Sequence, residues 1–244
     1  MLNRKETGYK KETSNNDISN SENDIEQENL RKMVKAEIEN CSKEKLEKLN
    51  INSLYNSVPV IDSLSKELCD EMIQLFERSN NRYTGITASG VNSQIKDTTD
   101  LVISSNPEWS EISKTLYREL QHNISKYVNK YNNMFDDYTI FHQYELEIPS
   151  MQMQKYNKNV GKYVYHNDFR CDFKDSIVRQ ITFLWYINDV DEGGETEFWS
   201  KYNIKPKTGK LVLFPAHWTY PHSAKKPISN DKYVITGWIW ERHG

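Results

Sequence analysis

Apolar positions are sparse in the first fifty residues and regular in the rest of the chain. Residues 1–24 are mainly Asn, Ser, Lys and Glu, and so few apolar anchors cannot offset the ordering entropy of the segment. We therefore expect a disordered or frayed polar tail over residues 1–24. Residues 25–56 contain strong helix formers without Pro or Gly, and their incomplete apolar stripe predicts a polar helical extension.

Two further helices are predicted between residues 63 and 131. Ser63 and Ser65 both suit the N-cap position of a helix that follows them. The second helix should run from about Pro107 to Tyr131, because proline is favoured at a first helical position and Asn106 suits the cap. Helical spacing is carried by Leu68, Met72, Ile73 and Phe76 in the first helix, and by Trp109, Ile112, Leu116, Leu120, Ile124 and Val128 in the second.

Strands dominate the remainder of the pattern. A short strand is predicted at residues 58–62, and from Tyr138 onward short β-branched and aromatic runs alternate with turn residues. The runs are YTIFHQYEL, SMQMQKY, GKYVYHND, IVRQITFLWYIND, ETEFW, GKLVLFP and KYVITGWIW. This spacing favours an antiparallel sandwich or small barrel. Helices followed by strands predict one α+β domain, in which the helices cover one face of a sheet.

Composition narrows the class of protein. The formal net charge of −3 gives no basic field for phosphates, so no nucleic-acid partner is expected. The cysteines Cys41, Cys69 and Cys171 show no CxxC spacing, which favours free thiols in a reducing compartment. No apolar run is as long as a membrane span, so we expect a cytoplasmic protein without membrane contact. The N-terminal helix leaves the role of a homodimer contact open.

Candidate chemistry begins with His166 and Asp168. They are two positions apart in a predicted strand, so their side chains should point to the same face. That pair alone suits a metal or a hydrogen-bonded structural pair. A second histidine, His222, lies between the runs KLVLFP and KYVITGWIW. Two imidazoles and one carboxylate occupy three positions of an octahedral metal and leave three open, as in non-haem Fe(II) oxygenases.

A lysine completes the pattern. Lys232 lies ten positions after His222 and opens the last predicted strand. A cation there can pair with the far carboxylate of a dicarboxylate cosubstrate. A lone lysine at a strand start is usually solvated, and only its spacing from His222 favours a binding role.

Six motifs, in this order, resemble those of the iron(II)- and 2-oxoglutarate-dependent dioxygenases, and specifically their prolyl 4-hydroxylase-like branch. They are QKYNKNVGKYVYHND, FLWYIND, GGETEF, PKTGKLVLF, PHSAKKPI and KYVITGWI. The helix SLSKELCDEMIQLFE also resembles the first helix of the family. The resemblance covers about residues 58–240 and implies a double-stranded β-helix, or jelly-roll, core in a dioxygenase domain at 57–244.

The resemblance also implies roles for individual residues. The Fe(II) ligands would be His166, Asp168 and His222. The 2-oxoglutarate site would contain Lys232, which binds the 5-carboxylate, together with Tyr156, Tyr186 and Thr196. The substrate side would contain Tyr163 and Trp238. Core packing explains the tyrosines and Trp238 equally well, and Thr196 on a strand is more often structural. Arg179 could meet an anionic substrate, although a solvated or ion-paired arginine is the more common case.

The implied reaction is hydroxylation of a C–H bond, with 2-oxoglutarate and O₂ as cosubstrates and ascorbate as a supporting reductant. Halogenating relatives replace the carboxylate ligand with a small residue, whereas this chain keeps Asp168. A prolyl residue in a peptide or protein is the first substrate candidate. A free amino acid or small metabolite is the alternative, and a non-catalytic metal-binding β-helix module is the rival of another class. The polar segment Arg82–Asp100 is expected to form a mobile entrance loop, with residues 168–176 as the opposite lip.

Overall fold

The computed structural model describes residues 28, 32, 33, 35, 55–134 and 146–242. The chain divides into two compact units, residues 1–51 and 52–244. In the first unit the four described residues are helical. The rest of the predicted tail and helical extension, and residues 138–145 of a predicted strand, lie outside the described residues. The domain boundary between residues 56 and 57 therefore stays a prediction.

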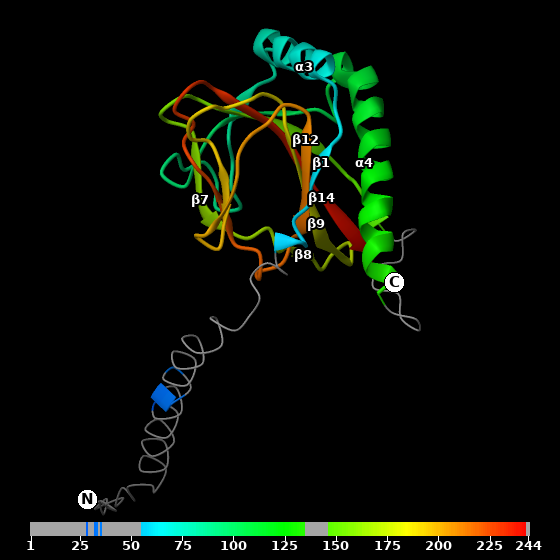
Figure 1. Cartoon of the computed structure of the whole chain (residues 1–244), viewed down its shortest axis with the longest axis vertical. Helices are drawn as coiled ribbons and strands as arrows, with labels where there is room; N and C mark the ends of the chain where they lie inside the picture. The colour runs from blue at the N-terminus through cyan, green and yellow to red at the C-terminus, as the bar shows by residue number, and fades with distance from the viewer. Residues whose placement is uncertain (1–27, 29–31, 34, 36–54, 135–145, 243–244) are drawn as a thin grey trace, which may run out of the picture. The chain divides into compact units, whose positions relative to one another are not determined.

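Two antiparallel sheets form the second unit (Figure 1). The larger sheet contains β1 (Val60–Asp62), β2 (Tyr83–Thr84), β4 (Thr99–Val102), β5 (Leu146–Glu147), β6 (Met151–Tyr156), β8 (Cys171–Asp172), β9 (Ile177–Tyr186), β12 (Lys210–Pro215) and β14 (Lys232–Arg242). The smaller sheet contains β3 (Lys96–Asp97), β7 (Lys162–His166), β10 (Thr196–Phe198), β11 (Tyr202–Ile204) and β13 (His222–Ala224). The main path of the larger sheet is β1-β12-β9-β14-β6-β4-β2, and the order of the smaller sheet is β11-β10-β13-β7-β3. Side chains of both sheets meet in one apolar cluster, so the sheets pack face to face as a jelly roll.

The helices begin where their caps predict. Ser65 accepts a hydrogen bond from the backbone N–H of Leu68 at the start of α3 (Lys66–Arg78). Asn106 caps a 3₁₀ turn, η1 (Pro107–Trp109), which leads into α4 (Ser110–Asn132). The predicted second helix is thus confirmed, except that its first turn is a 3₁₀ turn. None of the helices within the described residues is long and apolar enough to cross a membrane.

Alternation along the long strands separates two environments. Phe183 and Trp185 of β9 and Ile235 of β14 belong to the same buried cluster as the apolar residues of α3 and α4. Figure 1 shows α4 running beside the larger sheet at β9, β12 and β14. The intervening residues, such as Thr182 and Val234, point to the other face of the strand and line a cavity. One face of the sheet thus supplies the core, and the other supplies the site.

The segment Arg82–Asp100 is only partly the loop expected from its polarity, because residues 85–95 form turns and an isolated bridge while strands occupy its two ends. It contains β2, β3 and the beginning of β4, which pair with neighbours in both sheets. Lys96 and Asp100 within it are almost fully buried and form an ion pair at 2.6 Å between Nζ and Oδ2. The prediction of an entrance loop was wrong over these strands. They lack the apolar alternation of a typical strand, and long-range strand pairing and a buried ion pair hold them instead.

Candidate active site

The two histidines and Asp168 converge on one point. β7 ends at His166, and His222 begins β13 as its direct cross-strand partner. Asp168 follows two residues after the end of β7, so the assumption that it shares a strand with His166 was wrong. The Nε2 atom of His166 lies 3.8 Å from Oδ1 of Asp168, and Nε2 of His222 lies 3.6 Å from Oδ2. These separations exceed a hydrogen bond, and the three ligand atoms lie within 4.8 Å of one another.

Backbone carbonyls orient both imidazoles. Nδ1 of His166 lies 2.8 Å from the carbonyl oxygen of Val164, and Nδ1 of His222 lies 3.1 Å from that of Tyr220. Since the carbonyl can only accept, each Nδ1 donates, and each Nε2 keeps a lone pair directed at the carboxylate. Metal-binding histidines are held in this way by a partner on the other ring nitrogen. The donor set therefore fits a divalent metal such as Fe(II).

The surroundings hold the charge states that metal binding needs. Burial, with the neighbouring imidazole of His222, lowers the pKa of His166 to about 4. Burial alone would raise the pKa of Asp168. Its pKa is nevertheless held below the ordinary value by His222 and His166 and by the 2.9 Å hydrogen bond that Thr182 donates to Oδ2. At neutral pH the imidazole of His166 is uncharged and the carboxylate is ionised, as ligands must be.

A cavity between the two sheets contains this cluster. Its volume is about 660 Å³, including the open mouth. The polar lining comprises Lys96, Gln152, Gln154, Tyr156, Tyr163, His166, Asp168, Thr182, Thr196, His222, Lys232 and Thr236. The apolar lining comprises Ile86, Leu184, Phe214, Ala224, Val234 and Trp238. A mixed lining of this kind binds a small polar molecule while limiting access of water.

Lys232 is a buried cation on the wall of this cavity. It is 1% exposed, its Nζ donates to the carbonyl oxygen of Gly194 at 2.9 Å, and it lies 4.1 Å from the ring centroid of Tyr156. In the part of the chain that the structure describes, no carboxylate lies within ion-pair distance of Nζ. Burial lowers the pKa of Lys232 to about 7. An anionic group in the cavity would supply the missing counter-charge.

The other residues predicted for the cosubstrate site fall into two positions. Tyr156 and Thr196 line the cavity, and the hydroxyl of Tyr156 donates to Oε1 of Gln154 at 3.0 Å. Tyr186 is fully buried and does not belong to the cavity wall. Its hydroxyl donates to Oγ1 of Thr196 at 2.7 Å, and its ring belongs to the same apolar cluster as Tyr156, Phe214 and Val234 of the cavity wall.

The residues predicted for the substrate side are also divided. Tyr163 lines the cavity, and its ring stacks on His166 with centroids 3.6 Å apart. Trp238 lines it from β14. Arg179 stacks on Trp238, with its guanidinium 3.5 Å from the indole centroid, and its Nη1 donates to the backbone carbonyl of Asp168 at 3.4 Å. Burial lowers the pKa of Arg179 to about 10, although the charge of Asp168 opposes this. Arg179 is thus stacked on an aromatic ring, which neither of the expected arrangements anticipated.

Sequence reasoning did not single out the polar wall residues Lys96, Gln152, Gln154, Thr182 and Thr236. Thr182 and Gln154 occupy the same strand faces as Tyr186 and Tyr156, so period-two alternation along β9 and β6 could have identified them. Lys96 has no such signal, because it lies in a two-residue strand within a polar segment. His217 makes a 3.1 Å hydrogen bond with Gln180 and is not part of the converging set.

Residues 151–240 match the model of a family described as the 2OG-Fe(II) oxygenase superfamily. This part of the chain is similar to that superfamily over the matched residues. All of the convergent site residues, His166, Asp168, His222 and Lys232, lie inside the matched range. The superfamily uses Fe(II), 2-oxoglutarate and O₂, and the resemblance drawn from the six motifs is confirmed. A search of curated proteins finds no match.

Solved structures of 2OG-Fe(II) oxygenases and prolyl hydroxylases share the fold. A prolyl hydroxylase from Trichoplax adhaerens, in complex with a peptide fragment of the hypoxia-inducible factor oxygen degradation domain, has 21% identity and a TM-score of 0.58, covering 81% of this chain and 90% of that one. The viral collagen prolyl hydroxylase from Paramecium bursaria Chlorella virus-1, in complex with 2-oxoglutarate, has 21% identity and a TM-score of 0.54, covering 76% and 96%. A Pseudomonas putida prolyl-4-hydroxylase has 17% identity and a TM-score of 0.56, covering 77% and 93%. At these identities the likeness is one of fold.

Proposed function

We propose that this protein is an Fe(II)- and 2-oxoglutarate-dependent hydroxylase that acts on a prolyl residue in a peptide or protein. The observation that carries the proposal is the placement of two features in one cavity. They are a His–Asp–His set with converging donor atoms, and a buried lysine that forms no ion pair with a carboxylate of the described residues. A metal site alone would need only the first. The second fits a cosubstrate with a carboxylate at its far end.

Each residue has a distinct task in this proposal. His166, Asp168 and His222 hold Fe(II), which supplies the activation of O₂ that side chains cannot perform. Lys232 binds the 5-carboxylate of 2-oxoglutarate, with the ring of Tyr156 beside its ammonium group. Thr182 holds the carboxylate of Asp168 in its ligating orientation. The apolar side chains Leu184 and Phe214 limit access of water to the reacting atoms.

The assignment of the substrate rests on other features. Tyr163 and Trp238 place two aromatic side chains on the cavity wall, and such surfaces favour a compact apolar ring such as that of proline. The fold neighbours named above are prolyl hydroxylases, and one of them is bound to a peptide. We propose that Tyr163 and Trp238 contact the substrate, that Arg179 supports Trp238, and that residues 57–244 form the catalytic domain.

The test is succinate formation from 2-oxoglutarate under air, with Fe(II) and ascorbate. The wild type would be assayed with proline-containing peptides, with free proline and other amino acids, and without a prime substrate. Peptide-stimulated succinate together with a 16 Da increase in peptide mass would support the proposal. Stimulation by a free amino acid alone would replace the peptide by a small-molecule substrate.

A non-catalytic metal-binding module is the rival of another class. Such a module would bind metal through the same three residues but would form no succinate from an iron-loaded sample. The assay therefore separates the two classes before the substrate is known. A dimer through the N-terminal helix stays a separate prediction, and sedimentation of the full chain beside a chain beginning at residue 57 tests it.

A further inference from the structure

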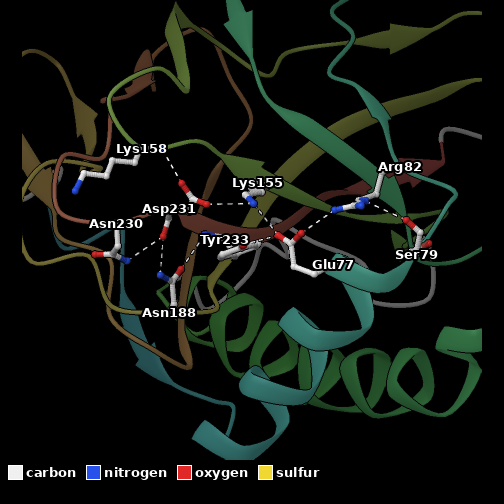
Figure 2. Close-up of polar contacts among 9 residues, drawn as sticks. All are labelled: Glu77, Ser79, Arg82, Lys155, Lys158, Asn188, Asn230, Asp231 and Tyr233. Carbon is white, nitrogen blue, oxygen red and sulfur yellow. Dashed lines mark hydrogen bonds and ion pairs between the residues drawn. The ribbon is translucent and has the colours of Figure 1, made fainter.

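Asp231 and Tyr233, the residues on either side of Lys232, are held by a network of polar contacts (Figure 2). Asn188, just after β9, accepts a hydrogen bond from the backbone N–H of Tyr233 through Oδ1 at 2.8 Å. Its Nδ2 donates to the carbonyl oxygen of Asp231, also at 2.8 Å. One carboxamide thus spans Lys232 along the backbone and binds the residue before it and the residue after it.

We call the two hydrogen bonds of Asn188 around Lys232 the clamp. The side chains of the flanking residues Asp231 and Tyr233 extend it. Asp231 accepts a hydrogen bond from the backbone N–H of Lys158 at 2.7 Å and pairs with Nζ of Lys155 at 3.1 Å. Lys155 also pairs with Glu77 of α3 at 2.8 Å, and the hydroxyl of Tyr233 donates to the same carboxylate. Figure 2 shows this chain of contacts from Asp231 through Lys155 to Glu77. It fixes both flanks of Lys232 to α3 and β6.

The clamp also reaches the second residue of the lysine site. Lys155 directly precedes Tyr156 in β6. Tyr156 is the cross-strand partner of Lys232 in β14, and its ring lies beside the ammonium of Lys232. Because side chains alternate along a strand, Lys155 and Tyr233 point to the outer face while Tyr156 and Lys232 point into the cavity. The outer polar contacts therefore set the backbone positions from which both inner side chains extend.

Lys232 needs such support for a physical reason. It is the first residue of β14, where only part of the strand ladder holds the backbone. Its side chain has four rotatable bonds, and its ammonium is buried with one hydrogen bond to a carbonyl. In the proposed complex, 2-oxoglutarate is fixed to the metal at one end, so its distal carboxylate has a defined position. A small displacement of the backbone at Lys232 would move the ammonium out of reach of that carboxylate.

We propose that Asn188 is a positioning residue for binding of 2-oxoglutarate, acting through Lys232 and supported by Asp231, Lys155 and Glu77. This inference rests on the proposed function, since it gives Lys232 the distal carboxylate as its ligand. Asn188 does not line the cavity and touches neither cosubstrate nor metal ligand. Substitution of Asn188 should weaken the binding of 2-oxoglutarate and leave the metal site intact.

The experiment compares two ligands in the full-length protein loaded with Mn(II). Isothermal titration calorimetry would measure the binding of two ligands. Binding of 2-oxoglutarate needs Lys232, whereas oxalate chelates a metal but has no distal carboxylate. In Asn188→Ala the dissociation constant for 2-oxoglutarate should rise 5- to 30-fold, with oxalate and Mn(II) changing less than 2-fold. The KM for 2-oxoglutarate should rise similarly, with kcat within 2-fold. Asn123→Ala is the matched control, because that buried amide only donates to Glu119 within α4.

A double-mutant cycle shows whether Asn188 acts through Lys232. In a Lys232→Met background, Asn188→Ala should change 2-oxoglutarate affinity less than 2-fold. Equal weakening of oxalate and 2-oxoglutarate, or additive effects in the double mutant, would overturn the inference. Asn188→Asp is the second variant if the alanine variant does not fold. It keeps the acceptor for Tyr233 and loses the donor for Asp231, and it should likewise weaken 2-oxoglutarate binding without weakening oxalate binding. A wild type that binds Mn(II) and oxalate but no 2-oxoglutarate would overturn the proposed function as well.

Discussion

His166 and His222 are direct cross-strand partners in β7 and β13, although 56 positions separate them in the chain. Their rings lie 4.3 Å apart between centroids. Strand pairing therefore places two imidazoles side by side, and Asp168 approaches both of them from the segment after β7.

Removal of either imidazole should abolish the metal site. His166→Ala and His222→Ala each delete one of three donors, and we expect metal affinity to fall by more than about 100-fold and succinate formation to disappear. Equilibrium competition with a chromogenic chelator measures the affinity. His217→Ala is the control, because His217 bonds to Gln180 and is not part of the converging set. Retention of wild-type metal affinity in His166→Ala would contradict the ligand assignment.

Thr182 should tune that site without being a ligand. Its hydroxyl donates to Oδ2 of Asp168 inside the cavity, and loss of a hydrogen bond to a metal ligand typically costs about 10- to 100-fold in affinity or activity. Thr182→Val keeps the shape of the side chain and should give that loss. Thr236→Val is the matched control, because the buried hydroxyl of Thr236 donates to the backbone carbonyl of Phe183. Equal metal affinities for the two variants would disprove the role of Thr182.

Binding of 2-oxoglutarate should depend on pH through Lys232. Burial lowers its pKa to about 7 in the unliganded protein, and the carboxylate can pair only with the protonated form. Below pH 7 Lys232 is already protonated and can pair with the carboxylate. Above pH 7 Lys232 must take up a proton when 2-oxoglutarate binds, so the affinity falls as the pH rises. The dissociation constant should therefore rise about 10-fold per pH unit above pH 7.

Calorimetric titration of the Mn(II) form between pH 6 and pH 9 measures this slope. In Lys232→Arg the cation stays protonated over that range, so the slope should disappear even if the affinity at pH 6 is lower. A flat profile for the wild type would exclude Lys232 as the titrating partner of the distal carboxylate.

The buried pair between Lys96 and Asp100 predicts a large effect on stability. Lys96→Met leaves an uncompensated carboxylate that is 1% exposed, and the free energy of unfolding should fall by about 3–5 kcal/mol. The double variant Lys96→Met/Asp100→Leu removes both charges and should recover most of that loss. Urea denaturation measures both values. Lys66→Met breaks the exposed pair with Asp70 and should leave stability unchanged within error.

The sequence by itself determined the local part of this protein. Ser65 and Asn106 identify the helix starts, because a cap satisfies backbone donors within three residues. Alternation along β9 and β14 separates a core face from a cavity face, because side chains of a strand point to opposite sides in turn. The six motifs that contain His166, Asp168, His222 and Lys232 gave the resemblance to 2OG-Fe(II) oxygenases, and the family model that matches residues 151–240 confirms that resemblance.

Tertiary structure alone decided the remaining features. Lys96 and Asp100 become buried because β3 and β4 pair with β7 and β6, and no residue pattern in that polar segment announces the pairing. Tyr186 bonds to the cavity-lining Thr196 without lining the cavity itself, and Arg179 stacks on Trp238, because strand pairing decides which side chains meet. Asn188 comes to bracket Lys232 because β9 and β14 are neighbours in the sheet. Such contacts join residues tens of positions apart, and local spacing carries no information about them.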